Sequence, residues 1–145
     1  MQRPCPVRLI RATAYCHSTE DCGKVAKALR NVVPGEVRMD RIAGYYGNAI
    51  TALYAEAEGC RASEIFANII KLIDDLDFEI LLNELTIYKN KLFIRLNKQK
   101  ALRGVLRLDS GDDVIHVEIR IPQASANSLI EELRKLRGSR RNRQE

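Results

Sequence analysis

The sequence predicts an α+β domain: a mostly antiparallel sheet with helices packed on one face and the other face open. Two observations lead to this class. Segments that alternate apolar and polar side chains, as β-strands do, follow one another through short turns, which favours antiparallel pairing. In the same segments the polar side chains fall regularly on one side, so one face of the sheet is expected to meet solvent.

The N-terminal half is expected to form three strands and one helix. Small apolar side chains fall on one side of the first strand, and in the helix they recur at the period of an amphipathic helix. Ser18 is expected to cap this helix, and Pro34-Gly35 to end it. The expected elements are a strand at residues 7–16, a helix between Ser18 and Pro34, and strands at residues 36–43 and 49–57 on either side of the loop GYYGN at residues 44–48.

The C-terminal half continues with two helices and three strands. The first helix is long and is expected to bend near Asp77. The expected elements are a helix at residues 62–85, strands at residues 91–97, 105–109 and 114–121, and a helix from Ser125 to Leu136. We therefore expect one domain at residues 1–137 and a basic disordered tail at residues 138–145.

The positive charge of the chain is unevenly distributed. The net charge is +5, and residues 134–145 account for all of it, with six arginines and lysines against one glutamate. Inside the neutral remainder, residues 89–107 hold seven lysines and arginines and no acidic residue, whereas residues 74–84 are acidic. Segregated charge of this kind favours a polyanionic partner more than the net value does.

The strand at residues 91–97 indicates what this charge faces. Cations around an exposed aromatic ring suit single-stranded RNA, because the cations neutralise phosphates and the ring can stack on a base. The alternative is a solvated face whose long side chains cover the sheet. Alternation places Lys91, Phe93, Arg95, Arg107, His116 and Arg120 on the open face. It places Leu92, Ile94, Leu96, Leu106 and Leu108 beneath the helices.

The connection at residues 98–104, KQKALRG, adds further cations in a segment that is expected to face solvent. Its lysines and arginine can reach a phosphate backbone, and Gln99 adds a neutral donor and acceptor. The arginines of the tail would add nonspecific, salt-dependent contacts. The candidate RNA-binding residues are Lys89, Lys91, Phe93, Arg95, Lys98, Gln99, Lys100, Arg103, Arg107, Arg140, Arg141 and Arg143.

The sequence contains only weak indications of a catalytic site or of a membrane segment. The loop GYYGN lacks the strand–glycine–helix setting and the lysine of a phosphate-binding loop. His17 and His116 lie on different elements, and no serine or cysteine is tied to either by local sequence. We therefore predict a protein without catalytic activity, cofactor or metal. No segment resembles a signal peptide or a membrane span, so we expect a cytoplasmic protein.

The four cysteines are Cys5, Cys16, Cys22 and Cys60, and they form no C-x-x-C pair. Cys16, Cys22 and the histidine between them could be imagined as three metal ligands, but the short paired spacings of zinc sites are absent. Because a cytoplasmic protein keeps its thiols reduced, we predict four free thiols without metal.

Three motifs resemble a family of small archaeal proteins that are predicted to bind RNA and are described as exosome subunits. The motifs are HSTED followed by KVAKALRNVVP, the loop GYYGN and, most specifically, LFIRLNKQKALRGVLRLDSGDDVIHVEIRI. Together they cover most of residues 7–121. The resemblance implies a fold like that of the ribosomal protein that binds five-S RNA. It also implies RNA binding, exosome subunits as partners and a link to 3′-end RNA processing.

The resemblance extends to single residues. Lys98 and Gln99 match the basic Lys-Gln pair of the family, whereas Asn97 stands where an aspartate is usual and Ala49 where a proline often follows. The residues that match the glycine loop of the family are Gly44, Gly47 and Asn48. Two other hypotheses stay open: an adaptor that docks separate proteins on its acidic helix and basic sheet face, and, with less support, a metal-dependent enzyme.

Overall fold

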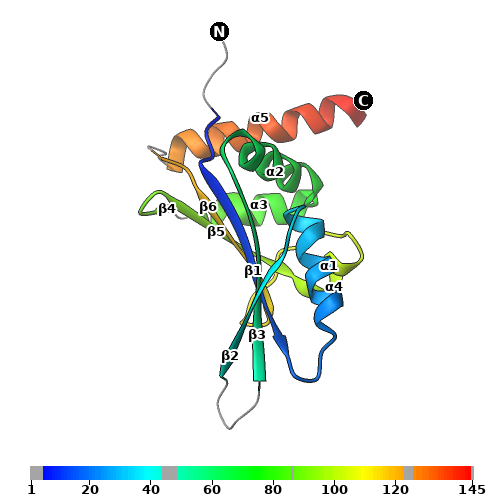
Figure 1. Cartoon of the computed structure of the whole chain (residues 1–145). Coiled ribbons are helices and arrows are strands. Elements are labelled where there is room, and N and C mark those ends of the chain that lie inside the picture. The colour runs from blue at the N-terminus through cyan, green and yellow to red at the C-terminus, as the bar shows by residue number, and fades with distance from the viewer. Residues whose placement is uncertain (1–4, 44–48, 86, 123–125, 145) are drawn as a thin grey trace.

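The computed structural model describes residues 5–43, 49–85, 87–122 and 126–144, with side chains for all of these except 43, 49, 126, 127 and 139–144. Within these residues one sheet of six strands is covered by helices (Figure 1). The strands are β1 (Leu9–His17), β2 (Arg38–Ala43), β3 (Ala49–Glu58), β4 (Ile87–Tyr88), β5 (Lys91–Asn97) and β6 (Val114–Arg120). The helices are α1 (Cys22–Val32), α2 (Gly59–Leu72), α3 (Asp75–Asn83), α4 (Lys98–Leu102) and α5 (Ala126–Gln144).

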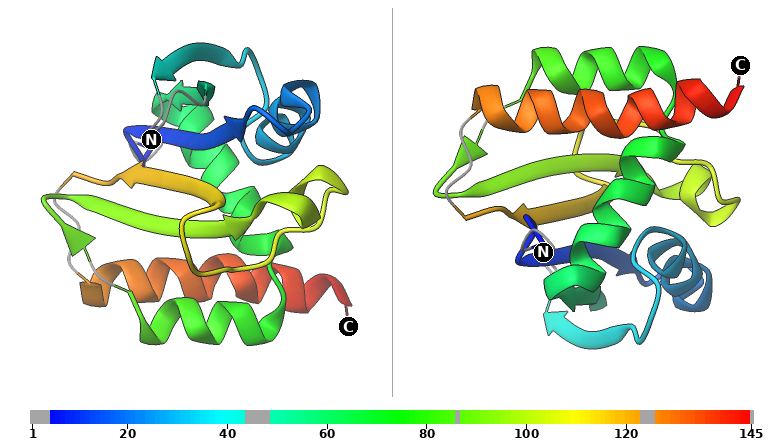
Figure 2. Two further views of the ribbon diagram at one scale, coloured as in Figure 1. Left: turned by 90° about the horizontal axis from the view of Figure 1, so that it is seen from below. Right: turned by 90° about the horizontal axis from the view of Figure 1, so that it is seen from above.

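The strand order in the sheet is β2-β3-β1-β6-β5-β4, and every neighbouring pair is antiparallel. Helices α1 and α2 pack on β1 and β3, and α5 packs on α2. Both views of Figure 2 show α3 and α5 side by side, whereas α1 and α4 lie together at one end of the sheet. The predicted fold class, an antiparallel sheet with one covered and one open face, is therefore confirmed.

Strict alternation in the strands separates the core from the open face. In β5 the side chains of Leu92, Ile94 and Leu96 are buried, and those between them are not. The same pattern in β1 buries Ile10 and Ala12. Burial of such apolar side chains contributes roughly 25 cal/mol per Å² of apolar area removed from water, so a slip of one residue in register would be strongly unfavourable.

Two helix boundaries differ from the expected ones. The cap of α1 is Asp21, whose carboxylate accepts a hydrogen bond of 2.9 Å from the backbone N–H of Gly23, and not Ser18. The expected long helix is two helices, because α2 ends at Leu72 and Asp74 begins α3 by accepting a 2.8 Å hydrogen bond from the backbone N–H of Asp77. In both cases the aspartate satisfies a backbone donor that the helix leaves free.

Arg137 holds the junction between α2 and α3 from the last helix. Its side chain is buried and donates to the backbone carbonyls of Ile70 at 3.2 Å and Ile73 at 2.6 Å. It also pairs with Asp75 and lies 5.0 Å from the centre of the Phe78 ring. Arg137 thus donates hydrogen bonds to carbonyls at the C-terminal end of α2, the region where a helix runs out of backbone donors.

The segment after β5 also differs from expectation. Residues 98–102, expected as a connection, form α4, because the Asn97 side chain accepts a 2.8 Å hydrogen bond from the backbone N–H of Lys100 and caps the turn. The expected strand at residues 105–109 makes a single bridge, between Leu96 and Leu108.

The last helix is longer than expected. The backbone of α5 is helical through Gln144, where the sequence predicted a disordered tail. Arginine and glutamine are good helix formers, and one glycine at position 138 costs a helix only about 1 kcal/mol. The division of the chain into a domain and a tail at residue 137 stays a prediction.

The prediction of four free thiols is wrong for this structure. Cys5 pairs with Cys60 and Cys16 with Cys22, at Cα–Cα distances of 5.1 and 5.5 Å that suit disulfide geometry. The compartment argument could not find these pairs, because the fold and not the spacing brings the partners together. In the described part of the chain, no helix is long and apolar enough to cross a membrane.

Candidate nucleic-acid interface

The open face of β5 presents the side chains that alternation placed there. Phe93 is exposed over 55% of its surface, Arg95 is exposed and Lys91 is half-buried. Leu106 is buried and Leu108 half-buried on the helix side, also as expected. The stacking hypothesis required an accessible Phe93 ring, and this requirement is met.

The register of the strands aligns a polar row across five strands, which we call the Arg95 row. Each member lies directly opposite the next on the neighbouring strand, from β5 through β6, β1 and β3 to β2. Five strands at about 4.8 Å spacing make the row about 19 Å long. The members are Arg95, His116, Thr13, Tyr54 and Arg38. The row contains no acidic residue.

The charged side chains of a second row, next to the first, all form ion pairs. It runs from Phe93 through Glu118 and Arg11 to Glu56. Arg11 pairs with Glu56 at 2.8 Å, and Glu118 pairs with Arg120 at 2.9 Å and Lys91 at 3.8 Å. By contrast, Arg95 forms no side-chain ion pair with the described residues.

Sequence reasoning missed the contribution of β1 and β3 to this face. Tyr15 is exposed over 38% of its surface, and Tyr54 lies 5.9 Å from the Arg11 guanidinium, measured to the ring centre. Alternation in these two strands would have placed both tyrosines on the polar side. The open face is therefore richer in aromatic rings than the basic stretch alone indicated.

A cleft with a volume of about 530 Å³ borders the open face beside β5. It lies between β5, α3 and the segment at residues 108–110, and its lining includes Phe93, Arg95, Leu81 and Leu85. On this side β5 pairs with β4 only at Lys91 and Leu92 and meets Leu108 only at Leu96. The cleft leaves room beside the Phe93 ring.

Arg107 does not face the open side of the sheet, contrary to prediction. Its guanidinium pairs with the carboxylates of Asp77 at 2.8 Å and Asp74 at 3.3 Å, both at the start of α3. The hydrogen bond from Arg107 to Asp77, and then the charges of Asp77 and Asp74, raise the pKa of Arg107 above its usual value. Asp77 is buried and also accepts a 2.8 Å hydrogen bond from the backbone N–H of Leu108. Arg107 thus ties its segment to α3.

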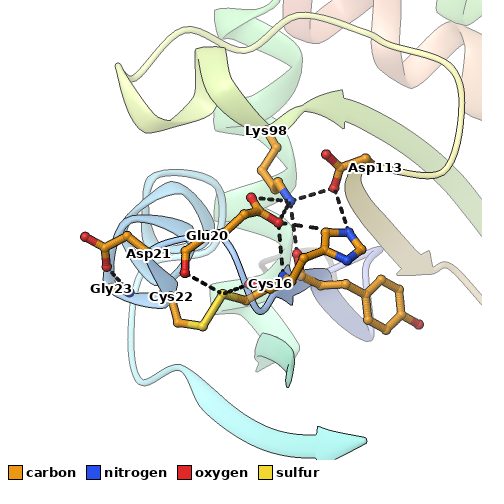
Figure 3. The surroundings of a disulfide bond; sticks show 9 residues. Cys16, Glu20, Asp21, Cys22, Gly23, Lys98 and Asp113 are labelled. Atoms are coloured by element: carbon orange, nitrogen blue, oxygen red, sulfur yellow. Dashed lines mark hydrogen bonds and ion pairs between the residues drawn. A yellow bond between two sulfur atoms is a disulfide. The ribbon is translucent and has the colours of Figure 1, made fainter. Parts of the chain in front are cut away.

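Lys98 is buried, and the prediction that it faces solvent is wrong. Its side chain is 3% exposed, and its ammonium group lies 3.0 Å from the carbonyl oxygen of Tyr15, 3.0 Å from the Glu20 carboxylate and 2.6 Å from that of Asp113 (Figure 3). A lysine can be buried where its charge and donors are satisfied in this way. Lys98 therefore joins the ends of β1 and β5 to the start of α1.

The same cluster contains groups that could bind a metal. His17 lies 3.9 Å from Glu20 and 3.7 Å from Asp113, and one ligand atom of each residue lies within 4.8 Å of the others. The Lys98 ammonium already lies against both carboxylates and neutralises much of their charge. Ion pairs with Lys98 therefore explain why Glu20 and Asp113 lie close together.

The remaining candidates lie at three different places. Lys89 is in the β4–β5 turn, where its positive φ of 52° suits a tight hairpin and its ammonium lies 5.3 Å from the Tyr88 ring centre. Gln99, Lys100 and Arg103 are exposed on and just after α4. The side chains of Arg140, Arg141 and Arg143 lie outside the described residues. The structure thus divides the basic stretch between the open face, α4 and the core.

An open antiparallel sheet with exposed aromatic rings, and cations beside them, defines a class of nucleic-acid-binding domains. The sequence profile of a family described as RNA binding matches residues 9–121 of this chain. The chain belongs to this RNA-binding family.

Two curated relatives match most of the chain. An uncharacterised protein of Methanocaldococcus jannaschii is 37% identical over an alignment of 117 residues, and the alignment covers 73% of this chain and 78% of that protein. An RNA-binding protein of Pyrococcus abyssi is 32% identical over an alignment of 123 residues, and the alignment covers 77% of this chain and 80% of that protein.

Solved structures with the same fold are also similar. A protein of Archaeoglobus fulgidus has a TM-score of 0.74 and 31% identity over 90% of this chain and 99% of its own. A protein of Sulfolobus solfataricus has a TM-score of 0.77 and 25% identity over 91% of this chain and 98% of its own.

Proposed function

We propose that this protein binds single-stranded RNA on its open sheet face and does not catalyse a reaction. The observation that carries the proposal is the acid-free Arg95 row beside the exposed ring of Phe93. Base stacking on an exposed ring is tolerant of sequence, and an arginine without an ion pair is available for a phosphate. The match to an RNA-binding family supports the same class of ligand.

Other candidate residues extend this site. Lys91 lies on the same strand as Phe93, and Lys89 lies in the turn at its start. We propose that the arginines at positions 140, 141 and 143 add nonspecific contacts, so removal of residues 138–145 weakens binding to all RNAs alike.

We also propose a cytoplasmic setting and an association with exosome subunits during RNA processing. Both rest on the resemblance of the motifs in residues 7–121 to the archaeal family. The two disulfides are compatible with the cytoplasmic setting, because intracellular proteins of hyperthermophilic archaea can be rich in disulfides. Co-purification with exosome subunits that survives ribonuclease treatment supports direct contact. Co-purification that is lost on treatment shows that RNA alone connects them.

The site is tested by titrating labelled single-stranded RNA with Phe93→Ala and Arg95→Gln variants. Because stacking is worth roughly 1–3 kcal/mol per base, the Phe93 variant is expected to bind about 5- to 150-fold more weakly. Leu76→Ala and Arg134→Gln are the matched controls, since both side chains are exposed on helices. Equal affinities for Phe93→Ala and Leu76→Ala would contradict the proposed site.

Two further measurements separate the proposal from the enzyme and adaptor hypotheses. RNA that is incubated with the protein is expected to keep its length, and defined cleavage products would instead indicate an enzyme. Absence of RNA binding, with retention of a protein partner, would favour the adaptor hypothesis.

A further inference from the structure

A second basic surface lies on the helical side of the molecule, where α1 meets α4. Five cationic side chains are exposed there, and none has a side-chain partner among the described residues. We call them the α1–α4 surface: Lys24, Lys27, Arg30, Lys100 and Arg103.

The cations of α1 occupy one side of the helix. Lys24, Lys27 and Arg30 recur every third residue, while Val25 and Leu29 on the other side are buried. Positions three apart are neighbours on a helix surface. At a rise of 1.5 Å per residue, the three cations extend over about 9 Å of the helix axis.

Contacts with the fold fix α4 against α1. The side-chain amide of Asn31 donates to the carbonyl oxygens of Ala101 at 2.8 Å and Leu102 at 3.3 Å. Lys98, at the start of α4, is anchored to the carboxylate of Glu20, just before α1. Both views of Figure 2 show the two helices next to each other. The cations of both helices therefore project from a common rigid support.

The two surfaces of the molecule differ in charge. On the open face, Arg11, Arg120 and Lys91 are already paired with glutamates. Neither α1 nor α4 contains an acidic residue, and Asp21 lies only at the N-terminal end of α1. The α1–α4 surface thus groups five exposed cations that form no ion pair with the described residues. Such charge is the main source of sequence-independent affinity for nucleic acid.

The two surfaces also differ in their aromatic content. Neither α1 nor α4 contains an aromatic residue, whereas the open face presents Tyr15, Tyr54 and Phe93. A rigid basic surface without rings suits the phosphates of a duplex, whose bases are stacked and inaccessible. A surface with rings suits a strand whose bases are free.

The two surfaces adjoin each other. Strands β1 and β5 both pair antiparallel with β6, so they run in the same direction and end at the same side of the sheet. After a short turn β1 leads into α1, and β5 leads directly into α4. Tyr15 and Arg95, near these strand ends, lie on the part of the open face closest to the two helices.

We infer that the α1–α4 surface docks the phosphate backbone of double-stranded RNA while the open face holds an adjoining single strand. The ligand is then an RNA in which a duplex continues into an unpaired strand. This inference rests on the proposed function, to which it adds the second surface and the form of the RNA.

The experiment compares three RNAs: a blunt duplex of about 16 base pairs, the length that a compact double-strand-binding domain spans, a single strand, and the duplex with a single-stranded extension. Lys24, Lys27 and Arg30 are replaced together by glutamine. The control replaces Arg8, Arg134 and Lys135 by glutamine, because these exposed cations lie elsewhere and the same charge is lost. Thermal unfolding verifies that both variants remain folded.

The wild type is expected to bind the extended duplex most tightly. The α1 variant is expected to lose at least about tenfold in affinity for both duplexes at low salt, because it lacks three cations that contact phosphates. Each lost phosphate contact also flattens the slope of log affinity against log salt by about 0.9. Three lost contacts flatten it by roughly 2.7 units. The control variant keeps a steeper salt slope than the α1 variant. The Phe93→Ala variant is expected to bind only the single strand and the extended duplex more weakly.

The outcomes separate this inference from the proposed function. If the wild type binds the single strand but not the blunt duplex, or if the α1 variant and the control lose the same slope, the inference is overturned and the proposed function stands. If the α1 variant weakens binding of the single strand as much as that of the duplex, the surface is not specific for duplexes. If Phe93→Ala alters no affinity while the α1 variant weakens all, the proposed site on the open face fails.

Discussion

Replacement of Lys98 by methionine tests the ion-pair network that joins α1 to the sheet. The variant keeps the apolar stem and removes an ammonium group that makes contacts of 3.0 Å with Tyr15, 3.0 Å with Glu20 and 2.6 Å with Asp113. Removing one partner of a fully buried ion pair costs about 3–5 kcal/mol. The Glu20 and Asp113 side chains are 22% and 60% exposed, so water can solvate both carboxylates after the change.

The main loss is therefore the charged hydrogen bond to the Tyr15 carbonyl, at about 1.5–3 kcal/mol, with a smaller share from the carboxylates. We expect a decrease of about 3 kcal/mol in the free energy of unfolding, which lowers Tm by roughly 6–12 °C. Urea unfolding at constant pH measures it, with exposed Lys100→Met as a control expected within about 0.5 kcal/mol of wild type. If Lys98→Met were as stable as the control, the network would not stabilise the fold.

Three other predictions concern the cross-links and the arginines. Thiol titration of the denatured, unreduced protein is expected to find no free thiol, and titration after reduction is expected to find four. The disulfide between Cys5 and Cys60 is expected to stabilise the fold by about 2 kcal/mol more than the other disulfide, because its loop has a sequence separation of 55 against 6. Arg137→Leu is expected to lower the free energy of unfolding by roughly 1.5–3 kcal/mol, measured by urea unfolding, because it removes the charged hydrogen bonds to the carbonyls of Ile70 and Ile73. The lost ion pair adds little, since the Asp75 side chain is 83% exposed. Stability equal to wild type would contradict this role. Arg107→Gln is expected to leave the affinity for single-stranded RNA within about twofold, whereas Arg95→Gln weakens it by loss of a phosphate contact; equal losses in titrations would place both residues at the RNA.

Sequence periodicity predicted the parts of the fold that depend on neighbouring residues. Alternation in residues 91–97 gave the bounds of β5 and the exposure of Phe93, because side-chain direction in a strand depends only on position. The same reasoning failed for Arg107, since its segment forms only one bridge and its side chain pairs with Asp77, 30 residues earlier.

The roles of Lys98 and the cysteines could not be read from local patterns. Lys98 stands at the start of a basic run like its neighbours, and its partner Tyr15 is 83 residues away. Cys5 and Cys60 are 55 residues apart in sequence and meet only after the sheet forms. The surface on α1 was visible as cations at helical spacing, but its significance depends on the position of α4, which the sequence did not predict as a helix.

The order of the strands has a consequence for synthesis on the ribosome. Strands β1 to β3 form one local antiparallel unit and β4 to β6 another. Among the described residues, the only direct strand pairing between the two units is that of β1 with β6. The central pair of the sheet therefore joins residues near opposite ends of the chain, and it cannot form until residues 114–120 have left the exit tunnel. Until then, β1 and β5 each present an unpaired edge that can associate with other chains. We expect chains truncated before β6 to aggregate, and the late arrival of this one strand to limit how fast the protein folds.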